Sequence, residues 1–398
     1  MKMKKISRYF NGVAILTLNT ILIWACLEIV SMAYMRLRSH VTLFDKKQEP
    51  PDAREKSSYY AGTNWGHEFW IEYAASRPEQ YHAFTVWRRG PYRGKYINID
   101  ERGIRFTPGS DCSANSFKVF VFGGSQIWGT GVPDWGTVPA YLETGLQNYK
   151  PGPVCVVNFG ESGYVSTQNV IQLILQLQSG NIPDIAIFIE GPTDIYSAYQ
   201  SGRSGLHENF GQIAARIERR DEPKSSLSIR LLESSFLFSV VSEQVAKLQG
   251  PQKSSQKPLT YVTMNVDANV LADGIIRTYL NNQQVVAALA QQYRFEHHFF
   301  WSPHILLGNK RLTGEEDSLK RALDPDLKKL YGLLYGAVQK HDLPGYSLTD
   351  VFDDCESLIW IDDAHSTAAG NEKIAQRILR QITAAKNDER VSPVPPRS

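Results

Sequence analysis

One pattern recurs along the chain after residue 116: a short apolar run, a turn, and a longer segment with apolar positions at helical spacing. Short apolar runs bounded by turns are typical of strands buried on both faces. Strands that alternate with helices predict a parallel sheet covered on both sides, an α/β fold. We expect strands at 118–122, 154–158, 184–189, 296–301 and 346–351, and helices at 137–147, 167–178, 282–292, 327–338 and 366–378.

The first 35 residues follow a different pattern. A basic segment, 1–11, holds four Lys or Arg residues and precedes an apolar run, 12–35, that is interrupted by Asn19 and Glu28. About 20 apolar residues suffice to cross a bilayer, so this run predicts a transmembrane signal anchor with a single pass. A cleaved signal peptide is the alternative, with Ser31-Met32-Ala33 as the cleavage site. The cationic density before the run places the rest of the chain outside the cytoplasm.

The rest of the chain divides by composition. Residues 36–58 are polar and predict a spacer, and residues 59–115 are rich in aromatic side chains, with a hairpin expected at 100–103. These aromatics either form a sugar-stacking surface or pack against the main domain, and packing is favoured because aromatic side chains are usually buried. The other predicted parts are a main domain at 116–385, an inserted cap within it at about 201–280, and a disordered tail at 386–398.

Composition excludes one class of partner and leaves the redox state open. A net charge of +2 gives no electrostatic basis for binding nucleic acid. A location outside the cytoplasm permits disulfides, and Cys112, Cys155 and Cys355 follow the apolar run. Since Cys155 lies in a predicted strand, we expect it to be a buried free thiol, which leaves Cys112 with Cys355 as the candidate pair.

A candidate nucleophile follows the first strand of the main domain. Ser125 comes directly after Gly123-Gly124, and glycines allow a sharp turn between a strand and a helix. Amides at the start of the next helix would favour a developing negative charge there. A phosphate-binding loop is the rival interpretation, but no Gly-Lys-Ser/Thr follows. A plain tight turn is the other alternative.

A serine needs a base to attack an ester, and Asp362-Asp363-Ala364-His365 contains one. Asp362 lies three residues before His365, a spacing that lets the carboxylate bond the imidazole and fix its tautomer. Asp363 is less well spaced for this role, although it stays an alternative. The histidines His297, His298 and His304 also suggest a metal site, but strand alternation turns the first two to opposite faces, so we expect no metal.

Four segments in this order resemble the SGNH/GDSL hydrolases: Gly123-Gly-Ser125, Asn158-Phe-Gly-Glu-Ser-Gly163, Gly191-Pro-Thr-Asp194 and Asp362-Asp-Ala-His365. The resemblance is greatest to envelope-associated members whose first motif reads Gly-Gly-Ser and continues as Gly131-Val-Pro-Asp134 does here. It implies a flavodoxin-like, three-layer α/β/α fold with Ser125 as nucleophile, His365 as base and Asp362 as its orienting carboxylate. It also implies an oxyanion hole formed by Ser125, Gly163 and the residue at position 193.

Position 193 departs from the family, which has Asn there whereas this chain has Thr193. A Thr hydroxyl donates one hydrogen bond but reaches less far. Asp194 is expected to order its loop. The function predicted is a serine esterase that needs no cofactor and acts on acylated glycans or lipids of the cell envelope. The alternatives are an O-acyltransferase with the same three residues, or a catalytically weak glycan-binding or assembly protein.

Overall fold

The computed structural model describes residues 2–44, 52–218, 235–248, 259–340 and 345–384. They belong to two units. The first combines the N-terminal 50 residues with residues 214–257, and the second comprises residues 51–213 and 258–398. The predicted tail at 386–398 lies outside the described residues. We describe each unit by itself.

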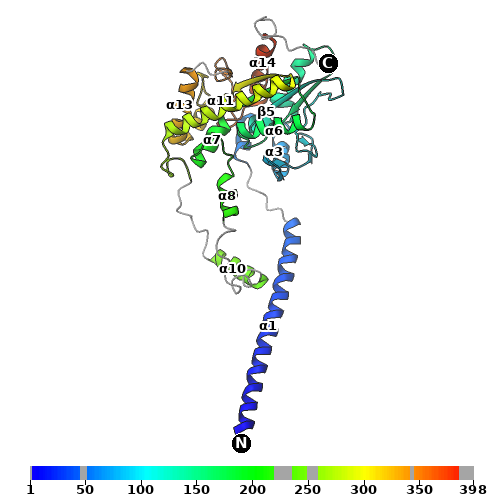
Figure 1. The fold of residues 1–398 in the computed structure, drawn as a ribbon, viewed down its shortest axis with the longest axis vertical. Coiled ribbons are helices and arrows are strands. Elements are labelled where there is room, and N and C mark those ends of the chain that lie inside the picture. The colour runs from blue at the N-terminus through cyan, green and yellow to red at the C-terminus, as the bar shows by residue number, and fades with distance from the viewer. Residues whose placement is uncertain (1, 45–51, 219–234, 249–258, 341–344, 385–398) are drawn as a thin grey trace. The chain divides into compact units, whose positions relative to one another are not determined.

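The second unit is built on a parallel sheet (Figure 1). Its five strands lie in the order β6-β5-β7-β8-β9, and every neighbouring pair is parallel. Numbered along the chain this order is 2-1-3-4-5, that of flavodoxin-like doubly wound sheets. The predicted strands are confirmed, and only the last is shorter than expected. Their bounds are β5 Phe117–Gly123, β6 Val154–Asn158, β7 Ile185–Glu190, β8 Glu296–Trp301 and β9 Tyr346–Ser347.

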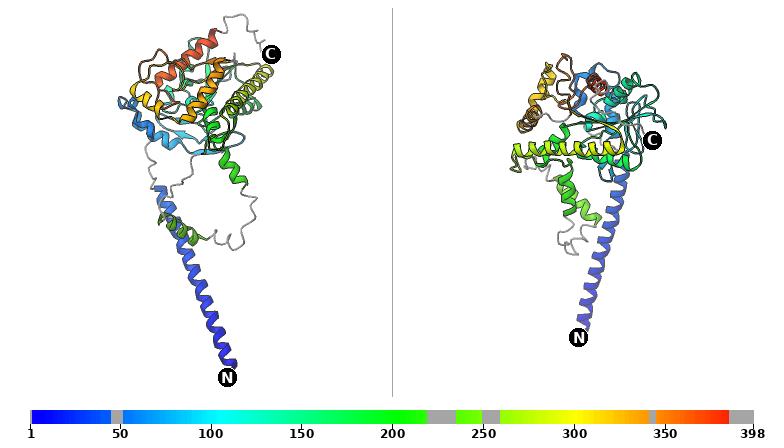
Figure 2. Two further views of the ribbon diagram at one scale, coloured as in Figure 1. Left: turned by 90° about the vertical axis from the view of Figure 1, so that its left-hand side faces the viewer. Right: turned by 45° about the horizontal axis from the view of Figure 1, so that its top comes forward.

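Helices cover both faces of this sheet, as the alternation of strands and helices predicts (Figures 1 and 2). Val119 and Val121 of β5 pack on one face, and Phe120 and Phe122 pack on the other. The first face is covered by α5 Val138–Gln147 and α14 Ala368–Ala384, and the second by α6 Ser166–Gln178, α11 Ala268–Tyr293 and α13 Pro325–Lys340. Further helices of this unit are α4 Ser125–Trp128, α7 Pro192–Ser201 and α12 Gly314–Ala322, with the 3₁₀ helix η2 at Asp134–Gly136. Helix α8 Phe210–Glu218 spans the boundary between the two units.

Helix α11 begins earlier than the sequence pattern indicated. It starts at Ala268, within the range 201–280 expected to be an inserted cap. Leu271 and Ile275 from this part of α11 are buried in the core cluster that covers the sheet. This stretch is therefore the start of one continuous helix that packs in the core.

Most aromatic side chains at the start of this segment form a packed cluster, as the packing alternative predicts. Phe69, Trp70 and Tyr73 are each no more than 5% exposed, and they pack with Trp128 and Ile361 of the main domain. The predicted hairpin is present, because Ile99 pairs with Arg105 across the turn. The elements of this segment are η1 Ala53–Lys56, α2 Ser58–Ala61, α3 Gly66–Ser76, β1 Glu79–His82, β2 Val86–Arg89, β3 Tyr92–Arg93 and β4 Asn98–Ile99.

The predicted cysteine pairing is wrong. Cys112 forms a disulfide with Cys155, while Cys355 is a buried free thiol. Strand β6 is at the edge of the sheet, and the chain before β5 runs along it: the Asp111 amide bonds the carbonyl of Val154. This contact brings Cys112 beside Cys155, a proximity that the buried-strand argument did not anticipate.

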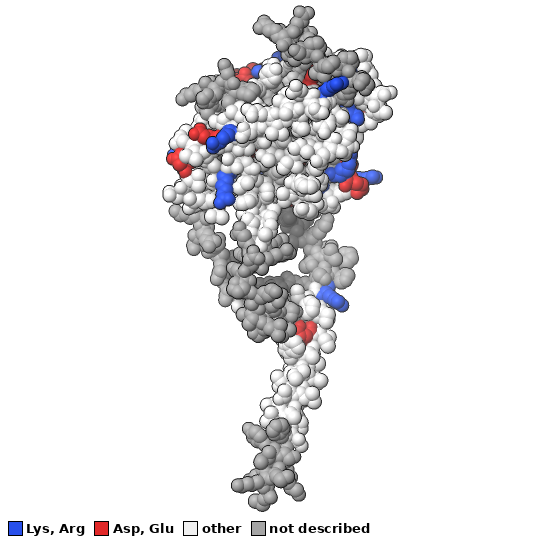
Figure 3. Space-filling view, viewed as in Figure 1, with Lys and Arg blue, Asp and Glu red and all other residues white. Residues whose placement is uncertain are grey.

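The first unit contains α1 Lys2–Phe44 and α10 Phe236–Leu248. Within α1, the stretch Asn11–Arg36 has a mean hydropathy of 2.1 and is long and apolar enough to cross a membrane. Figure 3 shows hardly any charged atoms along the described part of this helix. The helix continues to Phe44, into the range 36–58 predicted as a spacer, and the end of that range, from Asp52 on, belongs to the second unit.

Candidate active site

Ser125 lies where the sequence predicts, at the first position of α4 and two residues beyond the end of β5. The two residues before it must be small. A side chain at Gly124 would clash with Thr193 Oγ1, and one at Gly123 would clash with Ile127. Close approach of neighbouring groups, and not an unusual backbone angle, therefore requires glycine here. Because α4 is a single turn, individual amides and not a long helix dipole must stabilise charge near Ser125.

The structure brings Ser125 together with the two other predicted side chains. His365 Nε2 lies 2.7 Å from Ser125 Oγ, and His365 Nδ1 lies 2.6 Å from Asp362 Oδ2. The imidazole thus bridges the hydroxyl and the carboxylate, although Ser125 and His365 are 240 residues apart. A proton can pass from Ser125 Oγ to His365 Nε2 while Asp362 holds the proton on Nδ1.

Asp362 is fixed by bonds to both of its oxygens. Oδ1 accepts the backbone N–H groups of Ala364 at 2.9 Å and His365 at 2.7 Å. Arg54 Nη1 lies 3.5 Å from Oδ2, the oxygen that faces the imidazole. Burial alone would raise the pKa of Asp362, but the His365 ring and then the Arg54 guanidinium hold it below its usual range. The group is therefore a carboxylate across the physiological pH range. No sequence pattern points to Arg54, which lies in the predicted spacer at 36–58.

Asp363 has a different partner. Its Oδ2 lies 3.4 Å from Nε2 of the fully buried His304. His304 Nδ1 accepts the Leu306 amide at 3.3 Å, so Nε2 carries the proton and donates to Asp363. The His304 ring stacks on Tyr331 with centroids 4.0 Å apart. This geometry assigns Asp363 to His304, and among the described residues no group of three or more His, Cys, Asp or Glu could hold a metal.

A pocket of about 210 Å³ opens beside Ser125 and His365. The predicted oxyanion residues Gly163 and Thr193 both line it, Gly163 with a positive φ of 76°. Its other lining residues are Gly124, Gln126, Ile189, Glu190, Gly191, Pro192, Tyr196, Ser197, Glu208, Ser302, Tyr331, Asp363 and Ala364. None of the lining residues is Lys or Arg, whereas Glu190, Glu208 and Asp363 are acidic.

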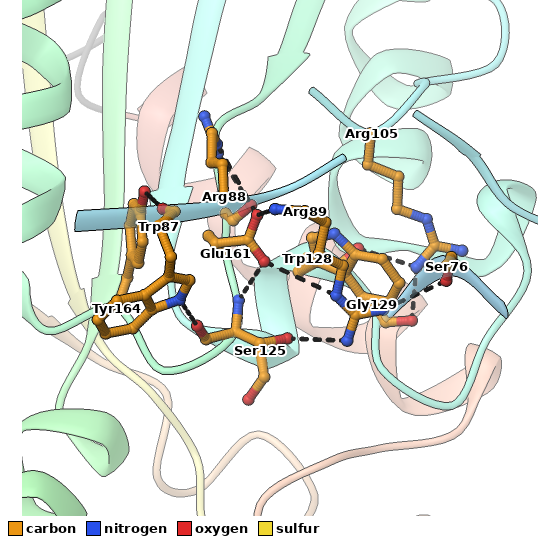
Figure 4. A network of polar contacts seen from close by, with 12 residues as sticks. Ser76, Trp87, Arg88, Arg89, Arg105, Ser125, Trp128, Gly129, Glu161 and Tyr164 are labelled. Carbon is orange, nitrogen blue, oxygen red and sulfur yellow. Dashed lines mark hydrogen bonds and ion pairs between the residues drawn. The ribbon is translucent and has the colours of Figure 1, made fainter. Parts of the chain in front are cut away.

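Residues of the aromatic segment form hydrogen bonds with the loop that ends at Gly163, a contact that the sequence did not reveal (Figure 4). Glu161 is fully buried and accepts the backbone N–H groups of Arg89 at 3.1 Å and Ser162 at 2.8 Å. The Nε atoms of Arg88 and Arg89 each lie 3.8 Å from its carboxylate. Trp87 Nε1 donates to the Ser162 carbonyl at 2.9 Å. Three successive residues of β2 thus set the path of the chain just before Gly163.

A second buried arginine supports the turn after Ser125. Arg105 is 1% exposed, and its Nη1 donates to the carbonyls of Trp128 at 2.9 Å and Gly129 at 2.7 Å. Its Nε donates to Asp134 at 2.8 Å, so the carboxylate of the Gly131-Val-Pro-Asp134 segment balances the buried charge. The guanidinium also lies over the Trp128 ring, 4.3 Å from its centroid. Hence the segment after the first motif serves to fix α4.

Two buried acids lie at the pocket, Glu190 at the end of β7 and Asp194 in the first turn of α7. Burial, reinforced by nearby Asp194, raises the pKa of Glu190 well above its usual value, and Asn169 Nδ2 donates to its Oε1 at 2.9 Å. Burial raises the pKa of Asp194 to about 6, although Ser166 Oγ donates to it at 2.7 Å. Asp194 thereby ties α7 to the start of α6, in line with a loop-ordering role.

We expect Glu190→Gln to flatten the pH dependence of stability. Glu190 stays protonated in the folded chain, whereas the unfolded chain releases this proton near pH 4.5, the ordinary pKa of the group. The free energy of unfolding should then fall as the pH rises above that value, by up to about 1.4 kcal/mol per pH unit. Gln keeps the shape and the bond from Asn169. Thermal melts from pH 4 to pH 8 should show a stability advantage of the variant that grows with pH, and a constant difference would contradict this.

Solved structures similar to this chain carry the names of esterases. No family model and no curated protein match it. The acetyl xylan esterase AlAXEase is 13% identical, with 67% of this chain and 99% of that chain covered and a TM-score of 0.35. A lipolytic G-D-S-L family protein from Veillonella parvula DSM 2008 is 12% identical, with 67% and 97% covered and a TM-score of 0.33. The acetylxylan esterase Axe2 from Geobacillus stearothermophilus is 14% identical, with 67% and 94% covered and a TM-score of 0.33.

These similarities are distant, so the internal geometry of this chain carries the conclusion. The four motifs meet around one pocket: Ser125 and Gly163 line it together with Thr193 and His365. The sheet has the expected parallel strand order. The hydrogen-bonded set of Ser125, His365 and Asp362 thus lies beside one pocket in a domain built on a parallel α/β sheet.

Proposed function

We propose that this chain is a serine hydrolase of the SGNH/GDSL type that acts on ester bonds. The observation that carries the proposal is the continuous set of hydrogen bonds from Ser125 Oγ through His365 to Asp362, at 2.7 Å and 2.6 Å, on the wall of a pocket. A serine hydroxyl is a weak nucleophile unless a base takes its proton, and this arrangement supplies the base and its orienting carboxylate.

In the proposed reaction, Ser125 Oγ attacks the ester carbonyl while its proton passes to His365 Nε2. The carbonyl oxygen becomes an oxyanion and accepts hydrogen bonds from the amides of Ser125 and Gly163 and from the Thr193 hydroxyl. The intermediate collapses when His365 gives the proton to the departing alcohol, which leaves an acyl ester on Ser125. A water molecule or another hydroxyl, deprotonated by His365, then attacks this ester and releases Ser125.

Thr193→Val is expected to lower kcat by about 100-fold, because one oxyanion donor typically contributes that much or more. Val has the shape of Thr without the hydroxyl. The position of Thr193 Oγ1 beside Gly124 and the pocket supports a direct donor role. Thr193→Ser and Thr193→Asn should retain most of the activity, since both keep a donor. Steady-state kinetics with a short acyl ester would test this, and full activity in the Val variant would mean that another group donates.

Size, charge and location support a short, uncharged acyl group on an envelope molecule as substrate. The pocket volume of about 210 Å³ is below the roughly 300 Å³ at which ligand pockets usually begin, so a short acyl group fits best. Glu208 and Asp363 on the pocket wall disfavour an anionic acyl group. With α1 as a membrane anchor and the second unit outside the cytoplasm, acylated glycans or lipids of the envelope would lie within reach.

Hydrolysis and acyl transfer use the same three side chains and differ in the acceptor that reaches the acyl-enzyme. O-acyl transfer therefore remains the second form of the proposal. The glycan-binding alternative loses part of its motivation, because the aromatic side chains that suggested a sugar surface are buried in the cluster around Phe69 and Trp70.

A fluorophosphonate probe followed by intact mass measurement tests the nucleophile. We expect one adduct on the full chain, located on Ser125 by peptide mapping and lost when the chain is first denatured. Incubation with an acetyl donor, with and without a sugar acceptor, then separates the two forms of the reaction: free acetate indicates hydrolysis, and acetylated sugar indicates transfer. Absence of any adduct, or an adduct on another serine, would refute the proposal.

A further inference from the structure

Helix α10 carries an apolar stripe that is about half exposed. Phe238, Val241 and Val245 follow each other at helical spacing and are 46%, 50% and 44% exposed. The side chain of Leu237, directly before Phe238, is partly buried. Phe236, which lies on another side of the helix, is also 40% exposed, so α10 exposes apolar surface on more than one side. Exposed apolar surface on a helix is typical of sites that contact a membrane or another protein.

Helix α10 is held against α1 by Glu28, the one acid within the apolar stretch Asn11–Arg36. The Glu28 carboxylate accepts the hydroxyl of Ser235 and the backbone N–H groups of Phe236 at 2.9 Å and Leu237 at 3.3 Å. These are amides at the start of α10, which have no partner within the helix. A carboxylate there satisfies them and is favoured by the helix dipole. These groups supply the hydrogen-bond donors that a carboxylate lacks in an apolar environment.

The position of Glu28 on α1 fixes the depth of α10 in a membrane. The stretch Asn11–Arg36 has 26 residues, about 39 Å of helix, which exceeds the roughly 30 Å hydrocarbon core of a bilayer. Glu28 lies eight residues before Arg36, about 12 Å along the axis. Part of this distance is surplus length that can extend beyond the hydrocarbon. The start of α10 would therefore lie near the outer boundary of the core, at the level of the lipid headgroups and upper acyl chains.

We propose that α10 is a second membrane contact, an interfacial helix whose stripe of Phe238, Val241 and Val245 enters the acyl-chain region. Its start is secured to the anchor by Glu28. We expect lipid to contact the stripe, because α10 is bonded to α1 within the membrane-spanning stretch. Apolar side chains at that level are surrounded by lipid acyl chains. This inference rests on the membrane role of α1 and adds that the segment inserted after α7 returns to the same bilayer.

Photocrosslinking of the full chain in phosphatidylcholine vesicles tests this contact. A benzophenone-bearing phenylalanine is placed at position 238, at position 239 on another side of the same helix, or at position 22 within α1. We expect a phospholipid adduct, detected by mass, from positions 22 and 238 and no such adduct from position 239. Ester hydrolysis by the same samples reports the proposed function independently of lipid contact.

The possible outcomes separate the claims. A lipid adduct from position 22 without one from position 238 would overturn the interfacial helix and leave the anchor intact. A crosslink from position 238 to a second protein chain would also overturn it, since the stripe would then be a protein interface. If position 22 fails as well, the membrane contact of both helices is refuted, while measured esterase activity would leave the proposed function standing.

Hydrogen exchange of the same reconstituted chain tests the role of Glu28. Glu28→Leu removes the acceptor and leaves an apolar anchor, so the amides of Phe236 and Leu237 should exchange faster than in the wild type. Thr20→Leu is the matched control, because Thr20 bonds only the backbone of its own helix among the described residues. Exchange that is equal in the two variants would contradict the capping contact.

Discussion

Replacement of Ser125 by alanine is expected to lower kcat for ester hydrolysis by about 10⁶-fold, the scale on which loss of a serine nucleophile acts in enzymes of this kind. The structure predicts such a large effect because Ser125 Oγ is the hydroxyl that contacts His365 Nε2, at 2.7 Å. KM should change much less, since the pocket wall stays intact. Steady-state kinetics with acetyl esters and loss of fluorophosphonate labelling would measure the effect.

Ser302→Ala is the matched control for this substitution. Ser302 lines the same pocket, but its hydroxyl donates to Gln126 Oε1 at 2.6 Å and not to an imidazole. The control variant should therefore keep both its labelling and most of its activity. Activity in the Ser125 variant close to that of the wild type would show that the arrangement with His365 is structural.

Asp362→Asn is expected to lower kcat by about 10⁴-fold near neutral pH while the fold is kept. The Asn oxygen can still accept the amides of Ala364 and His365 in place of Oδ1. Its NH₂ group would then face His365 Nδ1, which must become an acceptor. The ring proton moves to Nε2, and His365 can no longer accept the proton of Ser125. A thermal melt would verify folding, and pH–rate profiles would measure the loss.

Asp363→Asn separates the two neighbouring carboxylates. Asp363 is bonded to His304 and not to His365, so its replacement should reduce kcat far less than Asp362→Asn does. Equal losses in the two variants would mean that the carboxylates act as a unit. A larger loss at Asp363 would reverse the assignment of the orienting carboxylate.

The segment before the sheet acts on the site through other residues. Arg54 lies against Asp362 Oδ2, Arg89 and Glu161 set the loop before Gly163, and Arg105 holds the turn after Ser125. None of these arginines lines the pocket. They are positioning residues, and the aromatic cluster that buries their segment is therefore part of how the candidate site keeps its geometry.

Much of the sheet domain follows from the sequence alone. The predicted strands at 154–158 and 296–301 match β6 and β8 residue for residue. Short runs that contain several apolar residues and are bounded by turns are typical of strands in such a sheet. Each half of the candidate site is also recognisable from a short sequence segment. Asp362 and His365 are three residues apart, and Ser125 follows a buried strand, so each half of the arrangement could be recognised before the two were known to meet.

Tertiary structure alone decided which distant segments come together. Cys112 pairs with Cys155 across 43 residues because the chain before β5 runs along the edge strand, an arrangement that no spacing rule indicates. Arg54 reaches Asp362 across 308 residues, and Arg89 bonds Glu161 across 72. The periodicity of apolar residues predicts whether a residue is buried, because burial depends mainly on its position in its own helix or strand. It does not predict which distant residue it contacts, because that depends on how separate helices and strands pack.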